Sequence, residues 1–312
     1  MEQLVEVILA SGRTAIDMAL YILMPIMVVM LALMKLMDAK GILAFFARLL
    51  SPVVKVFGIP GLGVFALIKM LLVSFSAPVA TLSLMNSNGI AKRRIAATLA
   101  MLLCMSQANV VFPMMAVGLN MPVAIATSLI GGLFAASLTY YLLMPRDQEA
   151  EQETLVEPEI PAKSERKTAM QILADGGQEG MRITLAMLPM LMLALCLVNG
   201  LKATGVIDLM SELLAPLMAL LGLPEAAVLP LVTKYIAGGT AFMGVTLDLM
   251  DQGLITANEL NRMVGFATNP LDIVGVAVLV AAGSRVGEVA RVAVIGGLAG
   301  MFLRGILHLI IF

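Results

Sequence analysis

The stretch GLGVFALIKMLLVSFSAPVATLSLMNSNGIAKRR, which occupies residues 61–94, decides the fold of this chain. A continuous helix over residues 61–89 would extend roughly 43 Å at about 1.5 Å per residue, which exceeds a hydrocarbon core of about 30 Å. Ser74, Ser76 and Pro78 lie near the middle; proline removes a helix donor, and short hydroxyls offer the backbone other partners. We therefore expect a re-entrant hairpin with arms of about 13 residues and the sequence SFSAP at its tip.

Composition indicates a membrane protein. Hydrophobic residues make up 60% of the chain and charged residues only 13%, a balance typical of a polytopic membrane protein. The net charge of −1 gives no indication of a nucleic-acid partner. The two cysteines, Cys104 and Cys196, lie in apolar segments, where cysteine usually acts as a small packing residue. We expect a multi-pass protein of the cytoplasmic (inner) membrane, with the lipid bilayer as its surroundings.

The chain divides into two similar halves around a charged segment. Residues 146–182 hold nine acidic residues against five basic ones, which is typical of a solvated linker. We therefore expect a first repeat over 1–145, an acidic cytoplasmic linker over 146–181 and a second repeat over 182–312. The first repeat reads as a span, an interfacial helix, the hairpin, a broken span and a final span, over residues 14–37, 41–57, 61–94, 95–117 and 122–144.

The second half repeats the glycine and proline positions of the first. Apolar matches are common in such a composition, but a coincident series of glycines and prolines is not. At an offset of 164 residues, the matching pairs are Pro25 and Pro189, Gly41 and Gly205, Pro52 and Pro216, Gly58 and Gly222, and Pro60 and Pro224. At an offset of 165, they are Lys69 and Lys234, Met85 and Met250, and residues 131–132 and 296–297.

The basic residues favour an inverted arrangement of the two repeats. Three crossings per repeat invert the second copy and place most Lys and Arg of the short loops on one side, as the positive-inside rule requires. The opposite side would hold the uncharged loop 118–121 with Lys202 and Arg262. The side expected to be cytoplasmic holds Lys35, Lys40, Arg48, Lys55, residues 92–94, the linker, Arg285 and Arg291.

Four polar breaks interrupt the hydrophobic segments. They occupy residues 74–78, 106–109, 237–240 and 267–270, the last with Asp272 two residues on. Two are hairpin tips, and two interrupt the span after a hairpin. Because free backbone groups within a bilayer are tolerated only around a polar cavity, symmetric breaks predict a shared pocket near the midplane. The alternative is that each break is a packing kink satisfied by its neighbours.

Lys69 and Lys234 are intramembrane charges on the first arm of each hairpin. Such charges are costly and indicate function by default. The pair could favour an anionic group of a solute. Alternatively, each lysine could snorkel or pair with a carboxylate, with Asp248 and Asp272 as candidates. Asp272 could also take a coupling proton or sodium ion, or have a structural role.

The order of these elements, with the stretches SFSAP, SQANVVFP, GGTAFMG and ATNPLDIVG, resembles the Gate, or nucleoside-recognition, domain. That domain occurs in concentrative nucleoside transporters, in the membrane part of bacterial ferrous-iron transporter B and in spore maturation proteins A and B. The resemblance implies that hairpin tips and broken spans hold a solute through polar side chains. Carried over by position, and with Gly239 from the second tip, it nominates Ser74, Ser76, Gln107, Asn109, Gly239, Thr240, Thr268, Asn269 and Asp272.

The sequence departs from the nucleoside transporters in its tip chemistry. Those proteins carry acidic residues for the sugar hydroxyls in their hairpin and broken-helix regions, whereas SFSAP has none. The sequence also contains neither the extra scaffold spans of that family nor the GTPase domain of the iron transporter. It looks most like the stand-alone Gate proteins.

We expect an all-α polytopic membrane protein of two inverted repeats that acts as a transporter or permease for a small polar solute, nucleoside-like or a small organic anion. The alternatives are a non-transporting membrane scaffold or regulatory subunit, and an ion or metal permease. One histidine and no clustered cysteines weaken a metal route. No P-loop, G-x-S-x-G or H-E-x-x-H motif occurs, so we expect neither an enzyme nor a cofactor. A homo-oligomer remains an option.

Overall fold

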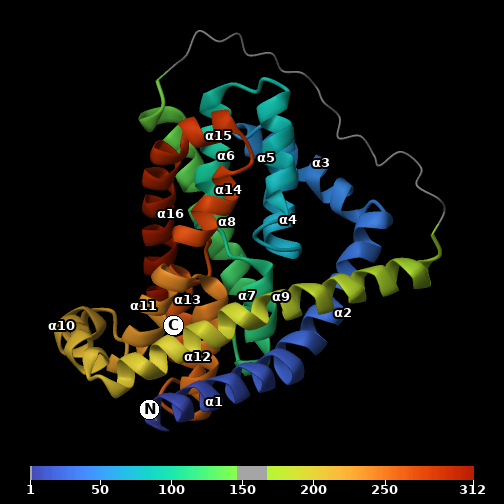
Figure 1. Cartoon of the computed structure of the whole chain (residues 1–312). Helices are drawn as coiled ribbons and strands as arrows, with labels where there is room; N and C mark the ends of the chain where they lie inside the picture. The colour runs from blue at the N-terminus through green and yellow to red at the C-terminus, as the bar shows by residue number, and fades with distance from the viewer. Residues whose placement is uncertain (1, 146–166) are drawn as a thin grey trace.

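The computed structural model describes residues 2–145 and 167–312, and all regular structure within them is helical (Figure 1). The first half runs through a long N-terminal helix, a short helix, a helical hairpin, an interrupted helix and a final helix. In chain order, the elements are α1 Glu2–Asp17, η1 Met18–Leu23, α2 Met24–Ala39, α3 Ile42–Lys55, α4 Gly61–Leu72, α5 Pro78–Ser87, α6 Lys92–Cys104, α7 Ala108–Met114, η2 Met115–Val117, α8 Met121–Leu138 and η3 Thr139–Leu143.

The second half passes through a similar succession, which differs from the first in its short elements. Its elements are α9 Ala169–Ala203, α10 Val206–Leu220, η4 Glu225–Ala227, α11 Val228–Ala237, α12 Gly239–Asp251, α13 Ala257–Ala267, α14 Ile273–Val280, α15 Ser284–Glu288 and α16 Ala290–Ile311. The expected all-helical fold and its duplicated element order are therefore observed. The inverted orientation of the two copies stays a prediction.

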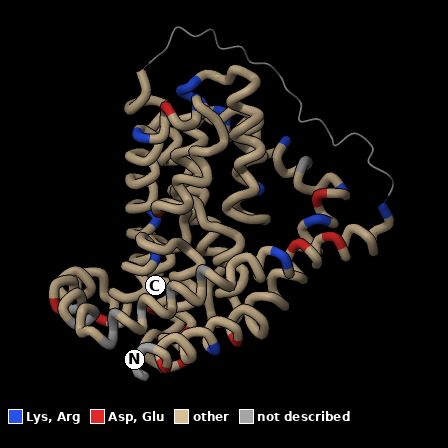
Figure 2. The backbone as a smooth tube through the Cα atoms, in the orientation of Figure 1, with Lys and Arg blue, Asp and Glu red and all other residues tan. Residues whose placement is uncertain are grey.

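Five helical stretches of the described residues are long and apolar enough to cross a membrane. The helices α10 and α11 form a further apolar pair that is bent by 105° between them. Figure 2 shows that charged residues are sparse along the middle of the bundle formed by α6, α8 and α16 and gather near its upper end. The five stretches are Val5–Ala39, Lys92–Val117, Met121–Leu143, Ala169–Leu197 and Ala290–Ile311. The chain is therefore a multi-pass membrane protein.

The first span is longer than the predicted 14–37, because helical structure is continuous over α1, η1 and α2. Pro25 lies inside this run and has no N–H to donate. The π-helical turn η1 directly precedes it. A wider turn shifts the hydrogen-bond register and lets the helix continue past a residue that cannot donate.

The helix α9 begins at Ala169, inside the segment 146–181 that the sequence predicts to be a linker. Residues 146–166 of that segment lie outside the described residues. The early start has a packing reason: α9 lies along α2 (Figure 1), and a Cβ atom at Gly180 would come within 2.7 Å of the Val28 Cα atom. Glycine at this position therefore allows close backbone contact, as in membrane helix pairs with small residues at the interface.

Of the five apolar stretches, Lys92–Val117 is the most deeply buried, and its helix α6 packs against α8 and α16. Glycines of α8 and α16 face each other at this contact: a Cβ atom at Gly131 would lie 2.8 Å from the Gly300 carbonyl oxygen. Of the repeated glycine pairs, Gly131 and Gly296 thus allow the final helices of the two halves to approach closely, whereas Gly132 and Gly297 face residues at and before the end of α6.

Each hairpin reverses at the predicted break. Residues 73–77 separate α4 from α5. A single residue, Gly238, separates α11 from α12, with φ +87° and ψ −179°, a backbone conformation that glycine alone adopts readily. The helix after each hairpin is also interrupted, at 105–107 and at 268–272. Local chain chemistry therefore places all four breaks.

Candidate functional site

The interruptions of the two broken helices contact each other. The Gln107 backbone N–H donates to the Thr268 carbonyl oxygen at 2.8 Å, although 161 positions separate the residues in the sequence (268 minus 107). The hydroxyls of Ser106 and Thr268 lie 3.0 Å apart. Backbone groups that each break leaves free are thus satisfied in part by the other break. This contact brings the polar centres of the two repeats together.

Arg304, on α16, binds both interruptions of the broken helices. It was not among the site residues that the sequence predicted. Its side chain is 0% exposed. Its guanidinium donates to the Ser106 hydroxyl at 2.6 Å and also to the hydroxyl of Thr268. It donates further to the carbonyl oxygens of Cys104 at 3.2 Å and of Val264 at 3.1 Å. These carbonyls lie in the last turns of α6 and α13.

No carboxylate pairs with Arg304 in the part of the chain that the structure describes. Its charge is instead met by the negative ends of two helix dipoles, α6 and α13. Arg304 lies within the apolar stretch Ala290–Ile311. A charged residue in such a stretch indicates a special role by itself, so the sequence contained a signal that points to Arg304.

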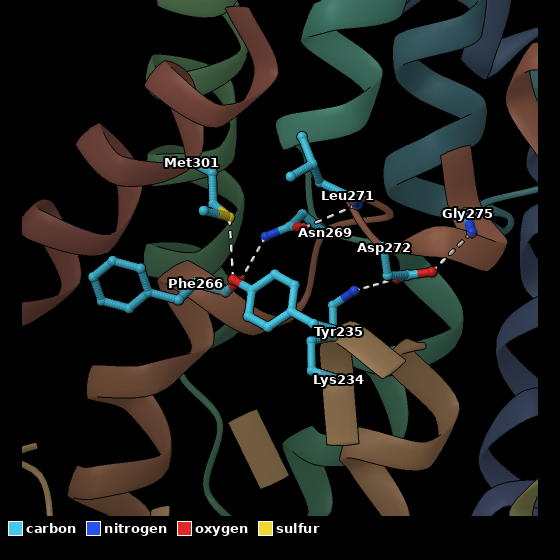
Figure 3. A network of polar contacts seen from close by, with 8 residues as sticks. All are labelled: Lys234, Tyr235, Phe266, Asn269, Leu271, Asp272, Gly275 and Met301. Atoms are coloured by element: carbon cyan, nitrogen blue, oxygen red, sulfur yellow. Dashed lines mark hydrogen bonds and ion pairs between the residues drawn. The ribbon is translucent and has the colours of Figure 1, made fainter. Parts of the chain in front are cut away.

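In the second repeat, the hairpin is joined to the broken helix by a buried ion pair (Figure 3). The Lys234 ammonium pairs with the Asp272 carboxylate, and both side chains are almost fully buried, at 0% and 2% exposed. The other carboxylate oxygen of Asp272 accepts the Gly275 N–H at 2.8 Å and caps α14. Of the two candidate carboxylates, Lys234 pairs with Asp272, whereas Asp248 bonds the Gln252 amide.

Asn269 stabilises the same break. Its amide nitrogen donates to the Phe266 carbonyl oxygen at 2.8 Å, and its amide oxygen accepts the Leu271 N–H at 3.0 Å. The Tyr235 hydroxyl donates to the same Phe266 oxygen at 3.1 Å (Figure 3). Thr268, Asn269 and Asp272 therefore all have protein partners.

In the first repeat, the polar groups are less fully paired. The Lys69 ammonium donates to the Thr81 hydroxyl at 3.3 Å, across the two arms of its hairpin. The hydroxyls of Ser74 and Ser76 lie 3.2 Å apart at the tip. Asn109 accepts the Phe75 backbone N–H at 3.3 Å through its amide oxygen.

The second tip lies on residues of both broken helices. A Cβ atom at Gly238 would lie 3.5 Å from the Asp272 carboxylate. A Cβ atom at Gly239 would lie 3.3 Å from the Gln107 amide oxygen, so the second tip also contacts the first repeat. Thr240 follows directly and is partly buried.

The structure thus divides the nominated residues into two groups. The first group has its polar atoms occupied within the protein and comprises Thr268, Asn269, Asp272 and Lys234. The second group lies at the hairpin tips and the first broken helix and includes residues that are exposed or only partly buried. It comprises Lys69, Ser74, Ser76, Gln107, Asn109, Gly239 and Thr240, of which Ser76 is exposed and Lys69 and Thr240 are partly buried.

Sequence comparison links the chain to one family. The family described as "Nucleoside recognition" (Gate) matches residues 184–289. Inner membrane protein YjiG of Escherichia coli K12 is 32% identical over 114 residues, which cover 35% of this chain and 74% of that protein. Spore maturation protein B of Bacillus subtilis is 34% identical over 76 residues, or 24% of this chain and 42% of that protein.

Comparison of structures gives the fold of the whole chain. A variant of the transporter CNTnw in an outward-facing state superimposes with a TM-score of 0.70. The match covers 99% of this chain and 83% of the transporter chain, at 17% sequence identity. CNTnw in an inward-facing, substrate-bound state matches with a TM-score of 0.69. The architecture of this chain is therefore that of CNTnw.

Proposed function

Because the chain belongs to the Gate, or nucleoside-recognition, family of membrane proteins, we propose that it transports a small polar solute across the inner membrane. One observation carries this proposal. Polar breaks in two hairpins and two helices meet in the interior of an otherwise apolar helical protein. A break in the bilayer interior costs stability unless its backbone groups are satisfied, and such breaks mark the solute sites of many transporters.

The solute would be held between the two hairpin tips by the less fully paired residues. Ser74, Ser76 and Asn109 offer groups from the first repeat, and Gln107, Gly239 and Thr240 lie together at the second tip. The hairpins, whose tips would line the site, are the elements that we propose to move.

The occupied group would have a structural task. In the described conformation, the Lys234 ammonium already neutralises Asp272. A coupling sodium ion at Asp272 would have to displace that ammonium, and a coupling proton would leave it without a partner. We therefore assign Asp272 to hold the second hairpin against α14 rather than to bind an ion.

A non-transporting membrane subunit is the second candidate, and one observation favours it. Thr268, Asn269 and Asp272 make protein contacts with all or most of their polar atoms, as expected of a rigid scaffold. In a scaffold, substitutions at the tips would leave the function intact.

Ligand-induced stabilisation separates the two candidates. Full-length protein in detergent is heated with a panel of neutral nucleosides (uridine, adenosine) and of carboxylates (succinate, glutamate). A transporter predicts that at least one compound raises the Tm, since a ligand at about 100 times its Kd stabilises by roughly 2.7 kcal/mol. Asn109→Leu and Gln107→Leu should remove the shift, whereas Asn258→Leu, at an exposed position outside the site, should keep it. A panel without any shift would support the scaffold.

A further inference from the structure

The two hairpin lysines occupy equivalent positions but have different partners. Lys69 and Lys234 are 165 positions apart, and so are Gln107 and Asp272, which are the N-cap residues of α7 and α14. In the second repeat, the equivalent pair is an ammonium and a carboxylate. In the first repeat, the carboxylate is replaced by a neutral amide, whose side chain lies against Gly239 of the other hairpin.

Lys69 therefore lacks the counter-charge that Lys234 has. Its only polar partner in the described part of the chain is the Thr81 hydroxyl at 3.3 Å, and no described carboxylate lies within ion-pair distance. The residue lies on α4, a helix whose neighbouring side chains Leu67, Ile68 and Met70 are buried. An ammonium without a counter-charge in such surroundings is costly unless a ligand supplies one.

An unpaired donor lies at the same hairpin tip. Asn109 is 1% exposed, and its amide nitrogen has no hydrogen-bond partner. The amide orientation is set by the Phe75 backbone N–H, which can only donate and so selects the amide oxygen as its acceptor. The tip is also bonded to Lys69, whose carbonyl oxygen accepts the Ser74 N–H at 3.1 Å. Lys69 and Asn109 thus both bond the backbone of the same hairpin tip, at Ser74 and at Phe75.

Several polar groups at this tip can donate. Lys69 offers an ammonium, Asn109 a free N–H group, and Ser74 and Ser76 offer hydroxyls. The tip contains no acidic residue. A group that accepts several hydrogen bonds and carries negative charge suits such a set. A carboxylate does both, with two oxygens and a single charge that balances one ammonium.

We propose that the first hairpin tip binds the carboxylate of a small organic anion through Lys69 and Asn109, and that the internal carboxylate of Asp272 takes the corresponding place in the second repeat. This inference rests on the proposed transport function, because it names the class of solute. The two hairpins would then differ in function. The ammonium of Lys69 would bind the charge of the solute, whereas the ammonium of Lys234 is neutralised by Asp272 within the protein.

The test uses full-length protein in detergent, with succinate, glutamate, inorganic phosphate and uridine as probes. A carboxylate probe should raise the Tm of the unmodified protein. Lys69→Gln should weaken carboxylate binding by about ten-fold or more, the loss expected for one charge-assisted hydrogen bond. Lys40→Gln, at an exposed lysine between α2 and α3, should bind as before.

A matched pair at Thr81 separates charge from packing. Thr81→Asp places a carboxylate beside Lys69, so it should neutralise the ammonium internally and abolish binding of the carboxylate probe. Thr81→Val removes the hydroxyl without adding charge and should keep binding within about three-fold, since a neutral hydrogen bond contributes little net free energy. Thr81→Asp also keeps the test decisive if Lys69→Gln does not fold.

Four results would overturn the inference. Carboxylate binding that is unchanged in both Lys69→Gln and Thr81→Asp would show that the ammonium does not hold the anion. Stabilisation by phosphate alone would exclude the carboxylate. Stabilisation by uridine alone would refute the anionic solute while leaving the transport function standing, whereas a failure of every probe would count against both.

Discussion

The central residue of this protein is Arg304, which links the ends of two broken helices without a carboxylate partner in the described chain. Its guanidinium satisfies carbonyl oxygens of α6 and α13 and the hydroxyls of Ser106 and Thr268. Arginine suits this task because its planar group directs several donors in fixed directions and stays charged. Loss of this side chain would leave four buried acceptors with fewer partners.

We expect Arg304→Met to lower the free energy of unfolding by about 3 kcal/mol or more, because buried acceptors without partners cost roughly 1–3 kcal/mol each. Denaturant unfolding in detergent measures the change. Arg291→Met, at an exposed position on the same helix, is the matched control and should change stability by less than about 0.5 kcal/mol. Equal effects of the two substitutions would show that Arg304 does not join the broken helices.

The contact between α2 and α9 depends on the absence of side chains along one face of α9. A Cβ atom at Gly176 would lie 2.5 Å from the Ala32 Cα atom, and one at Gly180 would meet Val28 similarly. Lys35 of α2 pairs with Glu179 of α9 at 2.8 Å, beside these glycines. Backbone proximity and an ion pair thus act on the same segment.

Two glycines of α9 should respond to alanine with opposite sign. Gly180→Ala forces the helices apart and should destabilise the protein by about 1–3 kcal/mol, the usual cost of overpacking. Gly200→Ala, in the same helix, has open space around its Cβ position and should stabilise by about 0.5–1 kcal/mol, because alanine favours helix. Thermal unfolding of the two variants provides the comparison; the same sign for both would contradict this packing.

Taken as a whole, the protein combines two halves of similar element order that meet at their polar breaks. The basic residues of the loops predict that the copies are inverted in the bilayer. Loops at equivalent positions should then face opposite sides. Ser87 and Gln252 are such a pair, at the ends of the two hairpins, 165 positions apart and both exposed.

Labelling of single cysteines tests the inversion in whole cells. In a background with Cys196→Ala, Ser87→Cys should be protected from a membrane-impermeant maleimide, and Gln252→Cys should react. Cys104 is buried and should stay unlabelled. Reaction at both positions, or at neither, would show that the repeats are parallel.

The element order and the helix breaks follow from local properties of the chain. Apolar composition selects the bilayer, and Pro78, Gly238 and the neighbouring hydroxyls interrupt helices wherever they fold. These signals need no knowledge of distant residues, so the hairpins, the broken helices and the duplication could be predicted. The same local properties led us to assign residues 169–181 to a solvated linker, because this segment is charged. Its glycines, which pack on α2, gave no local signal of that contact.

The partners of the charged and polar groups depend on contacts between distant segments. Lys234 had two candidate carboxylates in the sequence, and only the packing of α11 on α14 selects Asp272. The same is true of Arg304 and of the donor left free on Asn109. Composition and chain stereochemistry therefore determine where this chain breaks within the membrane. The three-dimensional arrangement decides at which breaks the polar groups are paired within the protein and at which a charged group and a hydrogen-bond donor stay available to a solute. Such pairing requires atoms that are far apart in the sequence to lie within a few ångströms of each other.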